Sequence, residues 1–251
     1  CSGGDEAAVR NAILPFLPPP TIPLRAKGEI PIQINLIPEG ALETGNSIAV
    51  SAHMEELARL PTVRSGAIMP DACPSGSVPG TIPVGGIVAT ENAIHPGMHS
   101  ADICCSMAIS ILGDVDPHQV LDAGMQCSHF GGGGRTPGNE LAPPKEILSA
   151  MEGNPFLENL LAPAVAHFGT QGDGNHFFYV GRMASSGKVA LVTHHGSRKP
   201  GALLYKTGMA VAERFTKKLS PETPLHNAWI PFETPEGENY WKALQIIRAW
   251  T

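Results

Sequence analysis

The sequence is poor in charged and aromatic residues and contains no long apolar run. Of its 251 residues, 16% are charged and 6% are aromatic. No stretch approaches the roughly 18 apolar residues that a membrane-spanning helix needs, so we expect a soluble protein with no membrane partner. Acidic residues outnumber basic ones by 23 to 17. This balance argues against a protein whose whole surface is basic. The basic residues within 198–218 could form a local basic channel, but a solvated helix face is the simpler interpretation.

The cysteines are few and do not form a disulfide pattern. There are five, an odd number, and Cys104 and Cys105 are adjacent. A secreted disulfide scaffold has an even number of separated cysteines, whereas free or metal-bound thiols are typical of a reducing compartment. We therefore predict a cytoplasmic protein.

Glycine and proline are abundant, and they set the fold class. With 28 Gly and 24 Pro, about a fifth of the chain favours turns and loops, which is below a low-complexity composition. We predict an α+β fold: a mixed α/β single domain, loop-rich, with short strands around a metal site. Alternating and 3.6-residue patterns predict strands and helices. The strands are expected at 29–38, 66–69, 86–90, 106–112, 177–181 and 188–193, and the helices at 47–60, 117–126, 144–162, 202–218 and 236–250.

The first chemical motif is residues 100–105, SADICC, between a stretch of small residues and an apolar strand. On a tight turn, the spacing of Asp102 and Cys105 directs both side chains into one pocket, where a metal would bind the thiolate. A turn-forming Asp beside a buried structural Cys explains the motif equally simply. Cys104 is a competing ligand.

The second motif is residues 169–178, GTQGDGNHFF. Its glycines let a ligand approach the backbone closely. Asn175 offers an amide to a phosphate, and His176 stands at the start of a strand. A hairpin turn at Asp173-Gly174 is the alternative, but a turn does not need Asn175 and His176 side by side.

The third motif is residues 194–198, HHGSR, after an apolar strand. Polar side chains at a strand end are typical of active sites. We expect His194 to bind metal and His195 to support it, with Ser197 and Arg198 on an oxyanion. The alternative is a buried histidine whose ring nitrogens are hydrogen-bonded within the core. This would explain one histidine of the pair, but rarely both.

Two further segments are ambiguous. Asp71, in residues 69–74 (MPDACP), could orient a catalytic histidine or close an Asx-turn. The tetraglycine at 131–134 reads as a hinge or loop rather than a phosphate cradle, because no strand precedes it and no Lys-Ser/Thr follows it.

Together the motifs supply one carboxylate, one thiolate and two imidazoles. This mixed oxygen, sulfur and nitrogen set suits a divalent transition metal, and the spacing allows zinc. The adjacent phosphate-binding residue types indicate a metalloenzyme that acts on a phosphorylated substrate.

In this order and at these separations, the motifs resemble the RtcB family of RNA ligases over roughly residues 47–251, and the segment 229–240 (WIPFETPEGENY) adds to the likeness. The resemblance implies a catalytic domain at 47–251, preceded by a Pro-rich segment of unclear role at 1–46. It also implies a GTP- and Mn(II)-dependent ligase that joins RNA 3′-phosphate or 2′,3′-cyclic phosphate ends to 5′-hydroxyl ends. Such an enzyme would act in RNA repair or tRNA splicing. An archease-like accessory protein is an implied partner.

Carried onto this chain, the resemblance implies functional residues of three kinds. The metal ligands, for two Mn(II) ions, would be Asp102, Cys105, His176 and His194. Asn175 would contact the guanylate phosphate and Arg198 the RNA backbone. Asp71 would orient the nucleophile.

The chain also departs from the family pattern. Cys73 replaces a histidine, Cys104 a glycine, and Tyr179 a carboxylate that helps recognise guanine. The guanylylated histidine and a further metal-binding histidine have no counterpart here, and the helix at 236–250 shows no C-cap signal. We therefore expect the C-terminal part of the ligase to be missing, leaving a truncated, split or degenerate enzyme. A metal-dependent phosphohydrolase and a non-catalytic RNA-end or metal-binding module are the alternative functions.

Overall fold

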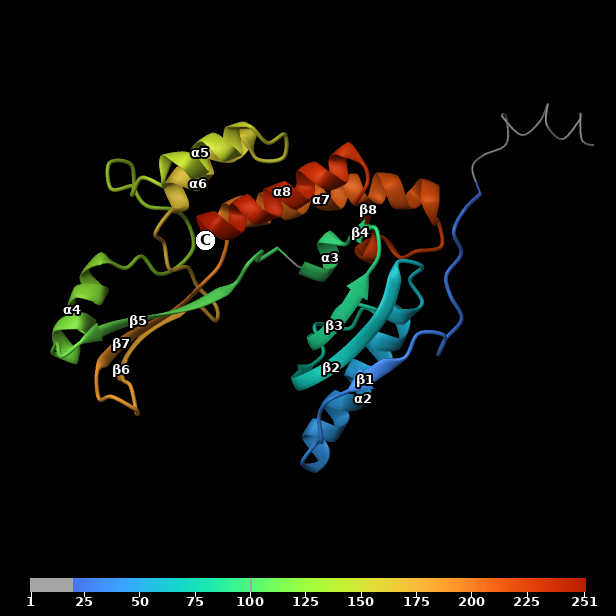
Figure 1. Ribbon diagram of the computed structural model, residues 1–251, viewed down its shortest axis with the longest axis horizontal. Coiled ribbons are helices and arrows are strands. Elements are labelled where there is room, and N and C mark those ends of the chain that lie inside the picture. Colours follow the sequence, from blue (N-terminus) through green and yellow to red (C-terminus); the bar gives the residue numbers. More distant parts are fainter. Residues whose placement is uncertain (1–19, 100) are drawn as a thin grey trace, which may run out of the picture.

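The computed structural model describes residues 20–99 and 101–251 and confirms the predicted α+β class (Figure 1). Over these residues it has seven α-helices and eight strands, and the strands form three small open sheets. The Pro-rich segment expected at 1–46 lies partly outside the described residues, since residues 1–19 are not among them. Within the described part, no helix combines the length and apolarity needed to cross a membrane.

The first unit is a three-stranded sheet covered by one helix, which we call the N-terminal unit. Strand β1 (Ile32–Ile34) runs parallel to β2 (Val63–Cys73), and β3 (Val84–Thr90) pairs antiparallel with β2. Helix α2 (Gly40–Ala58) packs on this sheet and begins before the predicted helix at 47–60. Apolar residues of α2, of β2 and of the turn between them form a closed core, comprising Val50, Met54, Leu57, Leu60, Val63 and Ile68.

The second unit is a layer of helices at the top of Figure 1. Its long members are α7 (Arg198–Leu219) and α8 (Pro235–Trp250), which start close to the predicted positions. Helix α8 starts at Pro235 because the Thr234 hydroxyl accepts the Gly237 N–H at 3.0 Å and caps the first turn. The smaller elements are β4 (Ala93–Ile94), α3 (Pro96–His99), α5 (Lys145–Glu152), η2 (Glu158–Leu160), α6 (Leu161–His167), η3 (Leu225–Asn227) and β8 (Ile230–Pro231).

The single helix predicted at 144–162 was wrong, because the chain breaks there into α5, η2 and α6. Helix α5 ends at Glu152 and Gly153 follows it. The Asn154 side chain then accepts the Phe156 N–H at 2.9 Å, which stabilises a turn. Pro155 stands between them, and the ring of a proline excludes continuation of a helix. The apolar period continues across this break, which is why the pattern alone suggested one helix.

The third unit is an antiparallel sheet in the order β5–β7–β6, which we call the site sheet. It contains β5 (Ser106–Gly113), β6 (Phe177–Arg182) and β7 (Val189–His195), and α4 (Pro117–Cys127) contacts β6. Central strand β7 pairs His194 with Met107 on one side and Phe177 on the other. This sheet lies at the left of Figure 1 and the N-terminal unit at the right, both below the helices.

Candidate metal and phosphate site

Four side chains predicted as metal ligands meet at one end of the site sheet. The Cys105 sulfur lies 2.8 Å from His194 Nε2 and 3.6 Å from His176 Nε2. His176 Nε2 lies 3.0 Å from an Asp102 carboxylate oxygen. The donor atoms of Asp102, Cys105 and His176 all lie within 4.8 Å of one another. We call Asp102, Cys105, His176 and His194 the donor cluster.

The strands bring the donor cluster together. His176 immediately precedes β6, while His194 is the penultimate residue of β7, and antiparallel pairing places these two strand ends together. Side chains alternate across a strand, so His194 and His195 point to opposite faces. His195 Nε2 instead lies 2.8 Å from the Thr251 carbonyl oxygen, outside the donor cluster. The pairing of β5 with β7 then carries Cys105, just before β5, to the same place.

The backbone separates the two adjacent cysteines. Cys104 has a φ of +59°, a left-handed conformation that is uncommon for a residue with a side chain. Its side chain packs against the helical core, and burial raises the pKa of its thiol. Cys105 is exposed toward the histidines. The structure therefore makes Cys105 the thiol available to the donor cluster.

Asp102 is held in place by the turn that enters α7. The Ser197 backbone N–H donates to Asp102 Oδ1 at 3.0 Å, and the Ser197 hydroxyl lies 3.5 Å from the same oxygen. Gly196 precedes this contact, and a Cβ there would lie 2.0 Å from Asp102 Oδ1. Only glycine permits this approach. Ser197 is fully buried, so the structure gives its hydroxyl a contact with Asp102; its predicted contact with an oxyanion stays a prediction.

A second glycine permits the close approach of His176 and Arg198. Gly172 has a φ of +93°, and a Cβ there would lie 2.0 Å from Arg198 Nη1 and 2.7 Å from His176 Nδ1. His176 Nδ1 is buried, and no hydrogen-bond partner for it exists among the described residues. Its other ring nitrogen faces Asp102 and Cys105. The imidazole is thus fixed with Nε2 toward the donor cluster.

The donor cluster has the chemistry of a divalent-metal site. Carboxylate oxygen, thiol sulfur and imidazole nitrogen are ligands for transition metals. Burial, and secondarily the negative charge of Asp102 and a hydrogen bond with it, raise the pKa of the Cys105 thiol to about 11. A cation bound here would instead lower the pKa of this thiol, because a thiol that coordinates a metal loses its proton. The residues present therefore fit a divalent transition-metal ion.

Beside the donor cluster lies a cavity of about 620 Å³, which we call the phosphate cavity; its lining includes the cations Arg198 and Lys199 and the carboxylates Asp102 and Asp173. Asp102 and His176 form one wall, and Asn175, Arg198 and Lys199 line the remainder. Asn175 is exposed, as a residue that contacts a ligand from solvent would be. The cavity thus joins candidate metal ligands to groups that bind phosphate.

Arg198 is anchored by several groups. Its Nε donates to Thr170 Oγ1 at 3.3 Å, and one Nη donates to the Gly131 carbonyl at 3.0 Å. The other Nη lies 3.6 Å from Asp173 Oδ1. The side chain is only 10% exposed, whereas that of Asp173 is 68% exposed. An incoming phosphate could replace this exposed carboxylate while the guanidinium stays in position.

Two parts of the phosphate cavity were not assigned to it from the sequence. Gly133 and Gly134, in the segment predicted as a hinge or loop, line the cavity. His167 also lines it, although it is only 8% exposed and its Nδ1 has no partner among the described residues. Burial, and next Arg198, lowers the pKa of His167. No local motif marks His167; only the packing of α6 against α7 brings it to Arg198.

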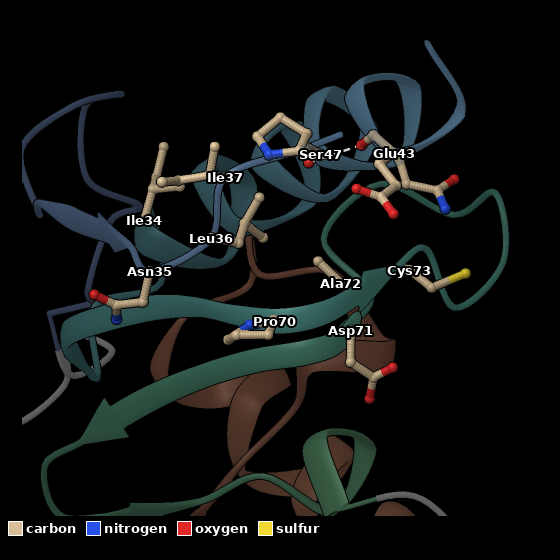
Figure 2. Close-up of a pocket in the computed structure, with 12 residues that line it drawn as sticks. Ile34, Asn35, Leu36, Ile37, Glu43, Ser47, Pro70, Asp71, Ala72 and Cys73 are labelled. Carbon is tan, nitrogen blue, oxygen red and sulfur yellow. Dashed lines mark hydrogen bonds between the residues drawn. The ribbon is translucent and has the colours of Figure 1, made fainter. Parts of the chain in front are cut away.

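Asp71 is not brought to the donor cluster. It lies in β2 of the N-terminal unit, with a φ of +75°, and lines a different cavity together with Cys73 (Figure 2). No residue lines both this cavity and the phosphate cavity. Its proposed role in orienting a nucleophile therefore stays a prediction. Tyr179 lies on the site sheet, two residues beyond Phe177, and is 61% exposed.

One family of known proteins matches part of this chain. The sequence model of the family described as tRNA-splicing ligase RtcB matches residues 145–250, which include His176, His194 and Arg198. No curated protein matches the chain. The family match indicates a function of the RNA-ligase type, with RNA as the substrate. This match supports the resemblance to the RtcB family that the sequence motifs suggested.

Proposed function

We propose that this chain forms the metal- and phosphate-binding part of an RNA ligase that joins 3′-phosphate or 2′,3′-cyclic phosphate ends to 5′-hydroxyl ends with Mn(II) and GTP. One observation carries the proposal: the donor cluster assembles from three segments that are far apart in the sequence, beside the phosphate cavity. The RtcB match over residues 145–250 supports the reaction type. We assign residues 47–251 to this catalytic unit.

The donor cluster would hold the metal. Asp102, Cys105, His176 and His194 would be its ligands, and the Cys105 sulfur lies within 3.6 Å of a ring nitrogen of both histidines. Bound there, the metal supplies positive charge that stabilises an in-line displacement at phosphorus. Ser197 acts on Asp102 by fixing the orientation of its carboxylate.

The phosphate cavity would hold the nucleotide and the RNA end. Arg198 would donate two parallel hydrogen bonds to a phosphate, and Lys199 would add charge at the mouth. Asn175 would donate its amide to the guanylate phosphate from the exposed turn before His176. These residues would position the phosphate beside the donor cluster. The carboxylate of Asp173, which is 68% exposed, could turn toward solvent as the phosphate binds.

Binding of matched RNA ends tests the proposal on the chain as it stands. In fluorescence anisotropy with Mn(II), an RNA that ends in a 3′-phosphate should bind about tenfold more tightly than the same RNA ending in a 3′-hydroxyl. Arg198→Lys should remove this preference. Arg182→Lys, at the far end of β6, is the matched control and should keep it. Equal affinity of the wild type for both RNA ends would refute the proposal.

The reaction type is tested separately with labelled GTP, Mn(II) and both RNA ends. A joined product supports ligation, with or without an added archease-like protein. A covalent guanylate would in addition require a nucleophile other than the family's guanylylated histidine, which has no counterpart in this sequence. Release of inorganic phosphate without an adduct would assign a phosphohydrolase instead. Preferential binding of the 3′-phosphate end with neither reaction would assign a binding module.

A further inference from the structure

A groove runs along the N-terminal unit, between α2 and the chain that leaves β1 (Figure 2). It consists of two cavities, of about 880 Å³ and 540 Å³. The cavities share four residues, which makes them one continuous depression: Ile34, Leu36, Pro38 and Ser47. We call this depression the β1–α2 groove. It contains no member of the donor cluster or of the phosphate cavity; of the residues predicted for the site, it contains Asp71 alone.

The β1–α2 groove exposes large apolar side chains. Ile34, Ile37 and Ile48 are 62%, 90% and 67% exposed. In the same unit, Met54 and Ile68 are fully or almost fully buried, so the unit has a complete core without these isoleucines. Isolated exposed apolar residues are ordinary, but several along one depression mark a binding surface.

The charges along the groove have one sign. Glu43, Glu55 and Asp71 line it, and no Lys, Arg or His does. Within residues 20–99 and 101–251, none of these three carboxylates forms an ion pair. Their uncompensated charge favours a cationic ligand.

The neighbouring Glu56 shows that this arrangement is specific to one side of α2. Its carboxylate pairs with Lys27 at 2.6 Å and with Arg59 at 2.9 Å. Hydrogen bonds from Lys27 and then Arg59 lower the pKa of Glu56. Glu55, one residue earlier, points into the groove and has no such partner. Glu56 is thus paired with cations, whereas among the described residues the groove acids have no cationic partner; the Glu43 carboxylate accepts the Glu39 backbone N–H at 2.5 Å.

We propose that the β1–α2 groove is a docking site for a basic amphipathic peptide segment of a partner protein. Apolar side chains of that segment would cover Ile34, Ile37 and Ile48, and flanking Lys or Arg residues would face Glu43 and Glu55. The combination of an apolar floor and an acidic rim selects this partner over RNA, whose phosphates the carboxylates repel. It also selects it over a second copy of the groove, because two acidic rims would repel each other.

The test uses a fluorescein-labelled peptide of about 12 residues whose Leu and Lys residues occupy opposite faces of a helix. Addition of the wild-type chain should raise the anisotropy of this peptide. A peptide of the same composition in scrambled order should bind with at least about tenfold lower affinity. The double variant Glu43→Gln/Glu55→Gln and the double variant Ile37→Ser/Ile48→Ser should each weaken binding about tenfold. All four residues are exposed, so these variants should fold, which circular dichroism checks.

Matched controls separate the groove from general acidity. Glu146→Gln/Glu152→Gln removes two exposed acids from α5 and should bind the peptide like the wild type. Equal peptide affinity of the groove variants and this control would overturn the proposal. So would dimerisation of the wild type through the groove, seen as a dimer in sedimentation that Ile37→Ser/Ile48→Ser abolishes. Metal binding measured on the same variants should be unchanged, so that failure here is distinguishable from failure of the proposed function.

Discussion

The N-terminal unit and the site sheet contain similar numbers of strands but are stabilised in different ways. The first has a closed core, in which Val50, Met54 and Leu57 are fully buried. The second exposes apolar side chains on its surface: Met107 is 65% and Ile109 56% exposed. Hydrophobic burial therefore stabilises the first, while the second depends on strand pairing and on polar contacts near the donor cluster. The region with the chemistry is the one with less burial.

The largest expected effect concerns the core of the N-terminal unit. Met54→Ala should lower the free energy of unfolding by about 3 kcal/mol, because it leaves a cavity among buried neighbours. Ile109→Ser, on the exposed face of the site sheet, should change it by less than about 0.5 kcal/mol. Urea denaturation measures both. A large loss from Ile109→Ser would show that this face is covered in solution and would remove the contrast.

The next effect concerns the donor cluster. Cys105→Ala should weaken the binding of Mn(II) or Zn(II) by at least about 100-fold in isothermal titration calorimetry, because it removes the sulfur between two imidazoles. Cys104→Ala should retain the metal, since Cys104 packs against the helical core. Equal losses from the two variants would show that the thiolate has been assigned to the wrong cysteine.

A smaller effect is expected where glycine permits a close contact. Gly196→Ala would place a methyl group against Asp102 and should weaken metal binding about tenfold by displacing the carboxylate. Gly45→Ala is the matched control in α2, where a Cβ meets nothing within 4 Å. It should leave metal affinity unchanged and stabilise the helix slightly. Unchanged metal affinity in Gly196→Ala would mean that Asp102 is not a ligand.

The smallest effect concerns a histidine that joins the N-terminal unit to the helical layer. His95 lies 2.8 Å from Thr62 Oγ1 and 2.9 Å from the Asn227 carbonyl, and burial lowers its pKa to about 4. Because the unfolded chain protonates His95 near pH 6.5, this stabilisation is present above pH 6.5 and is lost as the pH falls toward 4. Between pH 7.5 and 5.5 the unfolding free energy should drop by about 1 kcal/mol more in the wild type than in His95→Gln. Urea titrations at the two pH values measure this, and identical drops would exclude His95 as the sensor.

Several elements followed directly from local patterns. Helix α8 begins at Pro235, after a capping threonine, close to the predicted residue 236. Strands β6 and β7 were expected from their composition and intervening turn. The break after Glu152 was missed because the apolar period resumes beyond it, although Gly153 and Pro155 were the signal for it.

The candidate site could be predicted from the sequence only in part, because some of its contacts join residues that are far apart in the chain. The residue types of the donor cluster were evident because Asp102, Cys105, His176 and His194 occur in short polar motifs at strand ends. The contact between Ser197 and Asp102 spans 95 positions and leaves no local pattern. The position of the tetraglycine against the phosphate cavity likewise depends on long-range packing.

The sequence by itself determined the kinds of ligand and the strands that carry them, because residue chemistry and side-chain alternation are local properties. Only the tertiary structure decided which of Cys104 and Cys105 faces the histidines, and that Asp71 lies in another cavity. Neighbouring residues differ in direction through a single backbone dihedral angle, and distant ones meet through sheet register. Neither quantity can be read from the order of residue types.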